Sequence, residues 1–164
     1  MTPVCYVELN NHWLALTLAL VLAAGAAQLA AADSPVVPFK ATYYMSPKVV
    51  GVDPNGCNIQ QLPGVGQATH LGESTLYSDA VACPATLSQS GTLEFTEDNG
   101  DKLYGHFAGT LAFSYPNVSF TGDYWVDPPG TGRFEEVTGS GTYEGSAGLT
   151  TGKGIIYFQG ILIK

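Results

Sequence analysis

Positive charge is scarce in this sequence. Its 164 residues contain six Lys and Arg residues against fourteen Asp and Glu, and Arg133 is the chain's one arginine. No basic cluster occurs, so the phosphate backbone of a nucleic acid would be repelled rather than bound. We therefore expect no nucleic-acid partner.

Long apolar runs are absent outside the first 32 residues. There, Trp13 to Ala27 is apolar, and Ala30-Ala31-Ala32 precedes Asp33-Ser34-Pro35, which predicts a secretory signal peptide over residues 1–32. Glu8 and the lack of Lys or Arg before Trp13 depart from the usual positive start of a signal peptide, and a different start residue would account for this. The alternative is an uncleaved anchor, because about 20 apolar residues span a bilayer.

Cleavage of this signal peptide would release residues 33–164 as one domain. We expect this domain to be secreted or periplasmic, with no stable membrane insertion. Cysteine is also rare, and Cys5 would leave with the signal peptide. In an oxidising compartment, Cys57 and Cys83 would then form a disulfide, which stabilises the fold by up to about 3.5 kcal/mol in the chain-entropy estimate. A metal held by two free thiols is the alternative, but the C-x-x-C spacing typical of metal sites is absent.

Helical periodicity is missing after the predicted signal peptide. Apolar residues recur at every second position, and Gly, Pro, Asn and Asp interrupt the chain about every ten residues, which predicts an all-β protein. We predict seven or eight strands in all, including 38–45, 66–78, 91–98, 101–115, 118–126, 133–144 and 153–164, with a long loop over 46–63. Asn99-Gly100 lies between two alternating runs, which predicts a two-residue hairpin turn.

Glycine alternates with large side chains on one face of these strands. Gly105 and Gly109 share a face with Leu103, Phe107 and Leu111, a pattern typical of the interior of a small closed barrel. We therefore predict a closed antiparallel β-barrel of about eight strands.

Two other segments refine this prediction. Phe134 is out of phase with Val137, which predicts a β-bulge in strand 133–144. The last strand, 153–164, is apolar on both faces, so we expect its outer side to be covered, for example by another subunit.

Three segments carry a resemblance to known proteins. GQATHLGEST, GTLEFTEDNGDKLYGHFAGT and FTGDYWVDPPGTGRFEEVTGSGTYEG together resemble a group of largely uncharacterised exported bacterial proteins, over about residues 66–163. Residues 130–134 are also similar to a turn of the plant allene oxide cyclase and dirigent families. This likeness implies a calycin-like, eight-stranded barrel with an apolar interior open at one end, assembled as a homotrimer. The catalytic acids of those families find no match here.

Motifs for catalysis or metal binding are lacking. Ser140 and Ser146 do not lie in a G-x-S-x-G frame. His70 and His106 have no second His or Cys at ligand spacing, and residues 97–101 lack the D-x-D-x-D-G spacing of a calcium loop. We expect no metal and no cofactor.

Three charged or titratable residues leave alternatives open. His70 shares a face with Ala68 and Gly72, so it would either hydrogen-bond a ligand inside the barrel or be satisfied by a backbone carbonyl. Arg133 would either clamp a carboxylate or form an ion pair with Glu135 or an acid of a neighbouring strand. His106 is expected on the surface or in a subunit contact.

These residues support three functional hypotheses. The first is an exported barrel that binds a small apolar ligand, with Phe107, Phe120, Tyr124 and Tyr143 supplying walls and hydroxyls. The second, implied by the resemblance, is an isomerase or cyclase that uses His70 and Arg133. The third is a structural or partner-binding protein whose last strand forms the interface.

Overall fold

The computed structural model describes residues 34–164, which form β-strands and one 3₁₀ turn. The elements are β1 (Val36–Met45), β2 (Lys48–Val52), β3 (Asn58–Gln61), β4 (Gly64–Ala68), β5 (Gly72–Tyr77), β6 (Asp79–Cys83), β7 (Ser88–Glu97), β8 (Lys102–Ser114), β9 (Asn117–Val126), η2 (Gly132–Phe134), β10 (Thr138–Gly148) and β11 (Lys153–Ile163). The predicted signal peptide lies outside the described residues.

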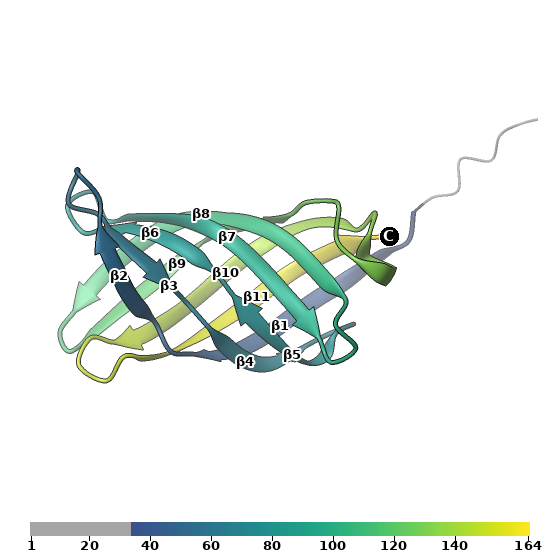
Figure 1. Ribbon diagram of the computed structural model, residues 1–164, viewed down its shortest axis with the longest axis horizontal. Coiled ribbons are helices and arrows are strands. Elements are labelled where there is room, and N and C mark those ends of the chain that lie inside the picture. The colour runs from purple at the N-terminus through teal and green to yellow at the C-terminus, as the bar shows by residue number, and fades with distance from the viewer. Residues whose placement is uncertain (1–33) are drawn as a thin grey trace, which may run out of the picture. The chain divides into compact units, whose positions relative to one another are not determined.

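The strands close into an eight-stranded antiparallel β-barrel (Figure 1). Each of the first three barrel strands is interrupted and carries two labels: β1 leads into β2, β3 into β4, and β5 into β6. β1 pairs with β4 and β2 with β3, while β5 and β6 both pair with β7. The ladder then runs in chain order from β7 to β11, and β11 pairs with β1, so the predicted closed barrel is confirmed.

The three interruptions lie side by side in the barrel wall. They fall at Pro47, Pro63 and Ser78, and hydrogen bonds from Ser46 N to Pro63 O (2.9 Å) and from Leu62 N to Ser78 O (2.8 Å) join them. Proline has no N–H to donate to a ladder, which suits Pro47 and Pro63 to these breaks. The predicted loop over 46–63 was therefore wrong: the prolines bracket two short strands, β2 and β3.

The predicted strand 66–78 was also wrong, because it is a hairpin. β4 and β5 are joined by a turn in which His70 has φ 70° and Gly72 has φ 65°. Asparagine, aspartate and histidine tolerate this left-handed region better than other residues, but without an Asn-Gly or Asp-Gly pair the turn has no strong sequence signal.

The turn at Asn99-Gly100 is a hairpin, as predicted, but one residue longer. Gly100 N donates to Glu97 O (2.8 Å) and Glu97 N donates to Asp101 O (3.0 Å), with φ 91° at Gly100. This pattern is a type I turn followed by a glycine bulge. The two strands that it joins, β7 and β8, match the predicted ranges closely.

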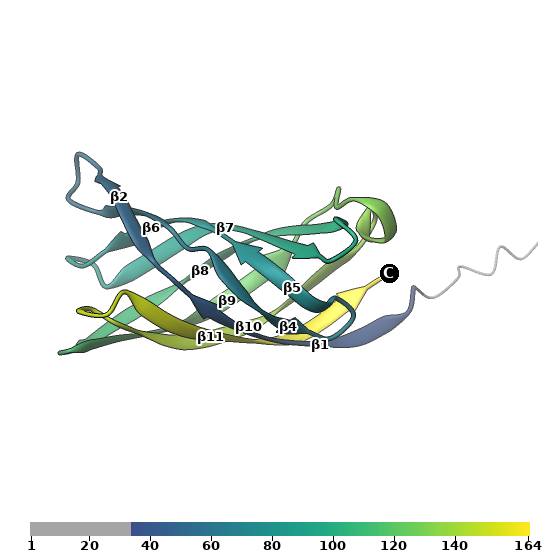
Figure 2. The same cartoon turned by 60° about the horizontal axis from the view of Figure 1, so that its bottom comes forward.

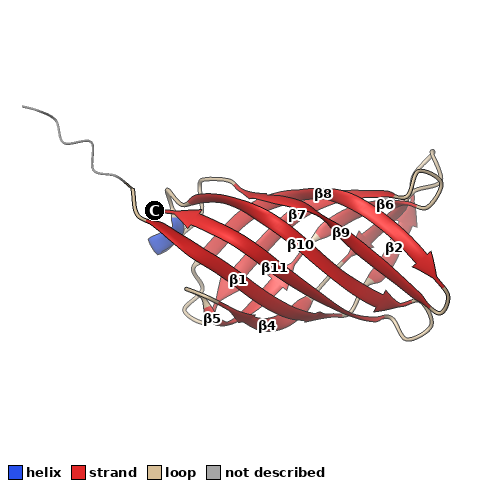
Figure 3. Ribbon diagram, turned by 180° about the vertical axis from the view of Figure 1, so that it is seen from behind, coloured by secondary structure: helices blue, strands red, loops and turns tan. Residues whose placement is uncertain are grey.

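The segment around Phe134 forms η2 instead of the predicted β-bulge. Phe134 N donates to Thr131 O and Val137 N donates to Phe134 O, so residues 131–137 turn tightly before β10 begins. Phe134 and Val137 are both buried, although they are out of phase along the chain. The turn thus folds inward over one end of the barrel, where it appears in blue in Figure 3.

The two ends of the barrel differ. At the closed end, η2, the β4–β5 turn and the β7–β8 turn meet, and Phe39, Leu103, Phe134 and Leu162 are fully buried. The opposite end carries β2 and the β8–β9 and β10–β11 hairpins (Figure 2). Its apolar side chains remain partly exposed, among them Val49, Phe113 and Leu149.

Aromatic rings fill the closed half of the interior. Phe95 lies 5.8 Å from Phe39, 5.7 Å from Tyr43 and 5.3 Å from Phe158 between ring centroids, and Tyr124 lies 5.3 Å from Phe158. Such edge-to-face and tilted pairs add to the stabilisation from burial itself. Of these rings, the inward alternation predicted for 118–126 covers Tyr124, which is fully buried as expected.

The predicted disulfide is confirmed. Cys57 and Cys83, 26 residues apart, are bonded and link the end of the β2–β3 loop to the end of β6. Asp53 supports the same loop, because its Oδ1 accepts hydrogen bonds from Asn55 N and Cys57 N, both at 2.8 Å. The disulfide therefore fixes the short strands that form one side of the open end.

Removing this crosslink should destabilise the barrel. We expect the Cys57→Ala, Cys83→Ala double variant to lose about 3 kcal/mol of unfolding free energy, because the unfolded chain regains the entropy of the open loop. Urea unfolding of the variant and of the reduced wild type measures this loss, and the two should agree. A loss below about 1 kcal/mol would contradict the expected role of the crosslink.

Candidate functional site

An apolar cavity of about 440 Å³ occupies the open half of the barrel. Pro47, Val49, Phe113 and Leu149 surround its mouth, and it reaches inward to Leu76, Leu93, Phe107, Tyr143 and Phe158. Its size falls within the range of small-molecule pockets. The barrel interior is thus packed at the closed end and hollow at the other.

The cavity wall carries no charged side chain among the described residues. Its polar side chains are the neutral groups Asn58, Gln60, Ser78, Gln89 and Tyr143. An apolar surface with a few polar groups is typical of a site that holds a neutral ligand and fixes its orientation.

Tyr143 lies along the barrel wall at the inner end of the cavity, because its partner on β9 is Gly122, which pairs in turn with Gly109 on β8. Its ring extends from β10 over Gly109 and Gly122, where an added methyl group would overlap the hydroxyl. The Gln89 amide on β7 donates a hydrogen bond to Tyr143 Oη at 3.0 Å. Burial raises the pKa of Tyr143 to about 12, so its hydroxyl keeps its proton at neutral pH.

Two buried hydroxyls lack a hydrogen-bond partner within residues 34–164. They are Ser78 Oγ, in the cavity wall, and Tyr124 Oη, which packs against Gly160 outside the lining. Burying an unpaired hydroxyl costs about 1–3 kcal/mol, so such groups are rare and often serve a ligand. Ser78 is the one of the two that belongs to the cavity lining, although its Oγ is itself buried.

The structure separates the predicted site residues into two groups. Phe107, Phe120 and Tyr143 line the cavity, whereas Tyr124 lies beneath it in the aromatic packing. His70 and Arg133 lie at the closed end, away from this cavity. The barrel therefore does not bring the histidine and the arginine together with the aromatic walls.

Arg133 joins three turns at the closed end. Its Nε donates to Glu97 Oε2 at 3.0 Å, and its Nη2 contacts both Glu97 Oε1 and the carbonyl of His70. The guanidinium also lies 4.9 Å from the Phe134 ring centroid. Arg133 therefore forms an ion pair rather than a free carboxylate clamp, but its partner is Glu97 of β7, which pairs with neither β9 nor β10 on the two sides of Arg133.

His70 is exposed at the turn and does not face the interior with Ala68. Its Nε2 lies 3.1 Å from the carbonyl of Pro38, which agrees with the prediction that a backbone carbonyl satisfies it. His106 lies on the outer face of β8, as expected, where it hydrogen-bonds Asp127 and stacks on Trp125 at 5.0 Å.

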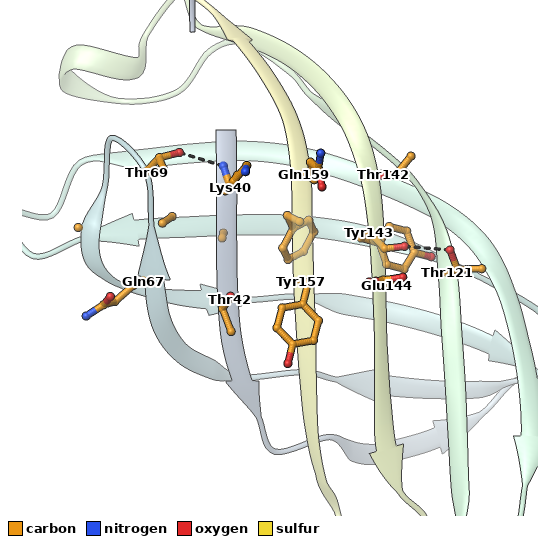
Figure 4. A pocket seen from close by; sticks show the side chains of 14 residues that line it. Lys40, Thr42, Gln67, Thr69, Thr121, Thr142, Tyr143, Glu144, Tyr157 and Gln159 are labelled. Carbon is orange, nitrogen blue, oxygen red and sulfur yellow. Dashed lines mark hydrogen bonds between the residues drawn. The ribbon is translucent and has the colours of Figure 1, made fainter. Parts of the chain in front are cut away.

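A larger hollow, of about 750 Å³, lies on the outer surface across β4, β1, β11, β10 and β9 (Figure 4). Its polar side chains, such as Gln67, Thr142, Glu144 and Gln159, point into solvent around Tyr157. Because it is a shallow depression of the wall, open to water, it encloses a ligand less well than the interior cavity.

Residues 34–164 contain neither a metal-binding cluster nor a membrane-spanning helix. No group of three or more His, Cys, Asp or Glu side chains there could hold a metal ion. The same residues contain no helix long and apolar enough to cross a bilayer.

Sequence reasoning missed Ser78 and Gln89. Ser78 lay inside a segment predicted as one strand, and Gln89 lay before the predicted start of its strand. The alternation of β7, read back from Phe95 and Leu93, would have placed Gln89 on the interior face.

Comparisons of the chain with protein-family models, curated proteins and solved structures found no match.

The buried tyrosines should make the barrel sensitive to alkali. Burial raises the pKa of Tyr43, Tyr124 and Tyr143 to about 12, above the ordinary value of 10.0. Above about pH 10 the unfolded chain releases these protons while the folded chain retains them, so stability should be constant below about pH 10 and fall towards pH 12.

Urea unfolding across this pH range measures the effect. Tyr124→Phe should reduce the alkaline loss and leave stability at neutral pH unchanged or higher, because it removes an unpaired buried hydroxyl. Tyr115→Phe is the matched control, since the Tyr115 ring is 82% exposed. Equal alkaline losses in both variants would contradict the expectation.

The closed end should depend on Phe134 more than on Arg133. Phe134→Ala should cost about 3–5 kcal/mol, because the ring is fully buried. Arg133→Ala should cost less, about 1–2 kcal/mol, because the Arg133 side chain is half exposed, although its partner Glu97 is only 16% exposed and would lose its counter-charge. Urea unfolding measures these losses of unfolding free energy, with Glu136→Ala, an exposed change on the same segment, as the control. A larger loss for Arg133→Ala than for Phe134→Ala would contradict this ranking.

Proposed function

We propose that the protein is an exported barrel that binds a small, neutral, apolar molecule in the cavity at its open end. The observation that carries this proposal is the uncharged, largely apolar lining of the 440 Å³ cavity. A folded interior normally fills such space, because empty apolar volume costs stability. A ligand would recover those lost contacts.

The exposed rim supports the same proposal. Val49, Phe113 and Leu149 are each about half exposed at the mouth, and contiguous exposed apolar groups commonly mark binding sites. β2 pairs with β3 alone, so its other edge has no partner strand within the described residues. The β10–β11 hairpin lies next to the start of β2, where Lys153 Nζ donates a hydrogen bond to Ser46 Oγ at 2.9 Å. This part of the rim gives a ligand a way in.

Export is a further part of the proposal. The Cys57–Cys83 disulfide fits an oxidising compartment, in agreement with the signal peptide predicted for residues 1–32. Binding is favoured over an isomerase or cyclase activity, because Tyr143 is the ionisable group in the cavity wall and its pKa of about 12 is far from that of an effective acid or base at neutral pH. Assembly as a homotrimer, or through the outer face of β11, stays a prediction.

A fluorescent apolar probe tests the proposed binding. N-phenylnaphthylamine should gain fluorescence in the presence of the wild-type protein and should raise its melting temperature. Ala147→Phe places a ring in the cavity wall near the mouth and should weaken probe binding about tenfold or more, by filling space that the ligand needs.

Ala108→Phe is the matched control, because Ala108 is exposed on the outer face of β8. It makes the same chemical change without entering the cavity, and it should bind the probe as the wild type does. Failure of the wild type to bind the probe, or equal binding by both folded variants, would contradict the proposal.

A further inference from the structure

We propose that the ligand carries a hydrogen-bond acceptor, a carbonyl oxygen above all, which receives the hydroxyl proton of Tyr143 at the inner end of the cavity. This inference rests on the proposed binding function and adds the chemical class of the ligand: a neutral apolar ketone, ester or related carbonyl compound. The carbonyl would enter first, and the apolar remainder would fill the space towards the mouth.

Because Gln89 donates a hydrogen bond to the Tyr143 hydroxyl, this hydroxyl is left free to act as a donor towards a ligand. Gln89 Nε2 donates to Tyr143 Oη at 3.0 Å, which occupies one of the two lone pairs of that oxygen. The hydroxyl proton itself has no acceptor within the described residues. Because Gly109 and Gly122 hold the hydroxyl against the wall and Tyr143 is only 2% exposed, its direction is fixed before a ligand arrives.

Ser78 gives independent support for a polar atom in the ligand. Its side chain lines the same cavity, the residue is 2% exposed, and its Oγ has no partner within residues 34–164. A cavity that served only hydrocarbons would be more stable with alanine at this position. The wall therefore retains hydrogen-bonding capacity that the described part of the chain does not itself use.

The charges around the cavity exclude the ionised relatives of such a ligand. No Lys, Arg or His side chain lines it, so a carboxylate would enter without a counter-charge. Arg133, at the closed end, is already bound to Glu97. Burying an unpaired carboxylate is strongly unfavourable, so fatty acids should bind less well than ketones of the same length.

A series of compounds with equal chain length tests the proposal. In a competition titration, four compounds are each tested for their ability to displace N-phenylnaphthylamine from the wild-type protein: decane, methyl octyl ketone, decanol and decanoate. Affinities for the ketone and for decane cannot be compared directly, because the carbonyl gives up hydrogen bonds to water that decane never made; each ligand is therefore compared between the wild type and a tyrosine variant. In the wild type, methyl octyl ketone should bind more tightly than decanoate by about tenfold or more, because the carboxylate would be buried without a counter-charge.

Two tyrosine variants locate the hydrogen bond. Tyr143→Phe should lower the affinity for methyl octyl ketone about tenfold, which corresponds to the loss of one hydrogen bond, and leave the affinity for decane unchanged. Tyr124→Phe removes an equally buried hydroxyl outside the cavity lining and should keep the wild-type affinity for the ketone. Melting temperatures of both variants confirm that they are folded.

The outcomes separate the two proposals. If neither the probe nor any of the four compounds binds, the proposed function fails. If the probe and decane bind but Tyr143→Phe keeps the wild-type affinity for the ketone, the carbonyl proposal fails and apolar binding stands. If decanoate binds most tightly, the assignment of a neutral ligand is wrong.

Discussion

The pairing of β1 with β11 is the contact on which the rest of the structure depends. Its antiparallel register runs from Val36 opposite Ile163 to Met45 opposite Gly154, and it turns a sheet with two open sides into a barrel. Closure satisfies the backbone groups of both strands and assigns alternate residues of every strand to the interior. Phe39 and Tyr43 of β1 and Phe158 of β11 are buried for this reason. The size of the inward side chains then decides which part of the enclosed space is filled.

The cavity follows from how side-chain size changes along the strands. In β5 and β6 the inward residues become small towards the open end, where Ser78 is followed by Ala80 and Ala82. Ala147 and Gly148 end β10 in the same way, whereas Phe39, Phe95 and Tyr124 fill the closed half. Gly122 and Gly109 beside Tyr143, and Gly141 and Gly160 beside Tyr124, leave room for these two rings to lie over the neighbouring strands of the wall. One interior therefore contains a packed core that supplies stability and a hollow that the proposed ligand would occupy.

The sequence predicted the long regular strands well and the short irregular ones poorly. Strands β7 to β11 are regular, and their two-residue alternation alone gave the interior positions of Phe107, Phe120 and Tyr143. The segment from Ser46 to Cys83 contains five strands, each of six residues or fewer, whose breaks at Pro47 and Pro63 looked like a loop. His70 in a left-handed turn gave no local signal, so its side chain was placed on the wrong face. Arg133 could not be assigned, because its partner Glu97 depends on how three turns meet in space.

The closed end carries an ion pair, whereas the cavity at the open end is lined by uncharged side chains. This contrast agrees with the proposal that the ligand is held by hydrogen bonds between neutral groups. The Arg133–Glu97 ion pair lies at the closed end, where the Arg133 side chain is about half exposed to water. Inside the barrel the same charges would require buried partners, whereas hydroxyls and amides can be enclosed with one or two hydrogen bonds. Tyr143 shows the advantage of this choice: with a pKa of about 12 it remains a donor at every physiological pH. A barrel with such a group can hold its ligand equally well in compartments whose pH varies, because neither the hydroxyl nor a carbonyl partner titrates in that range.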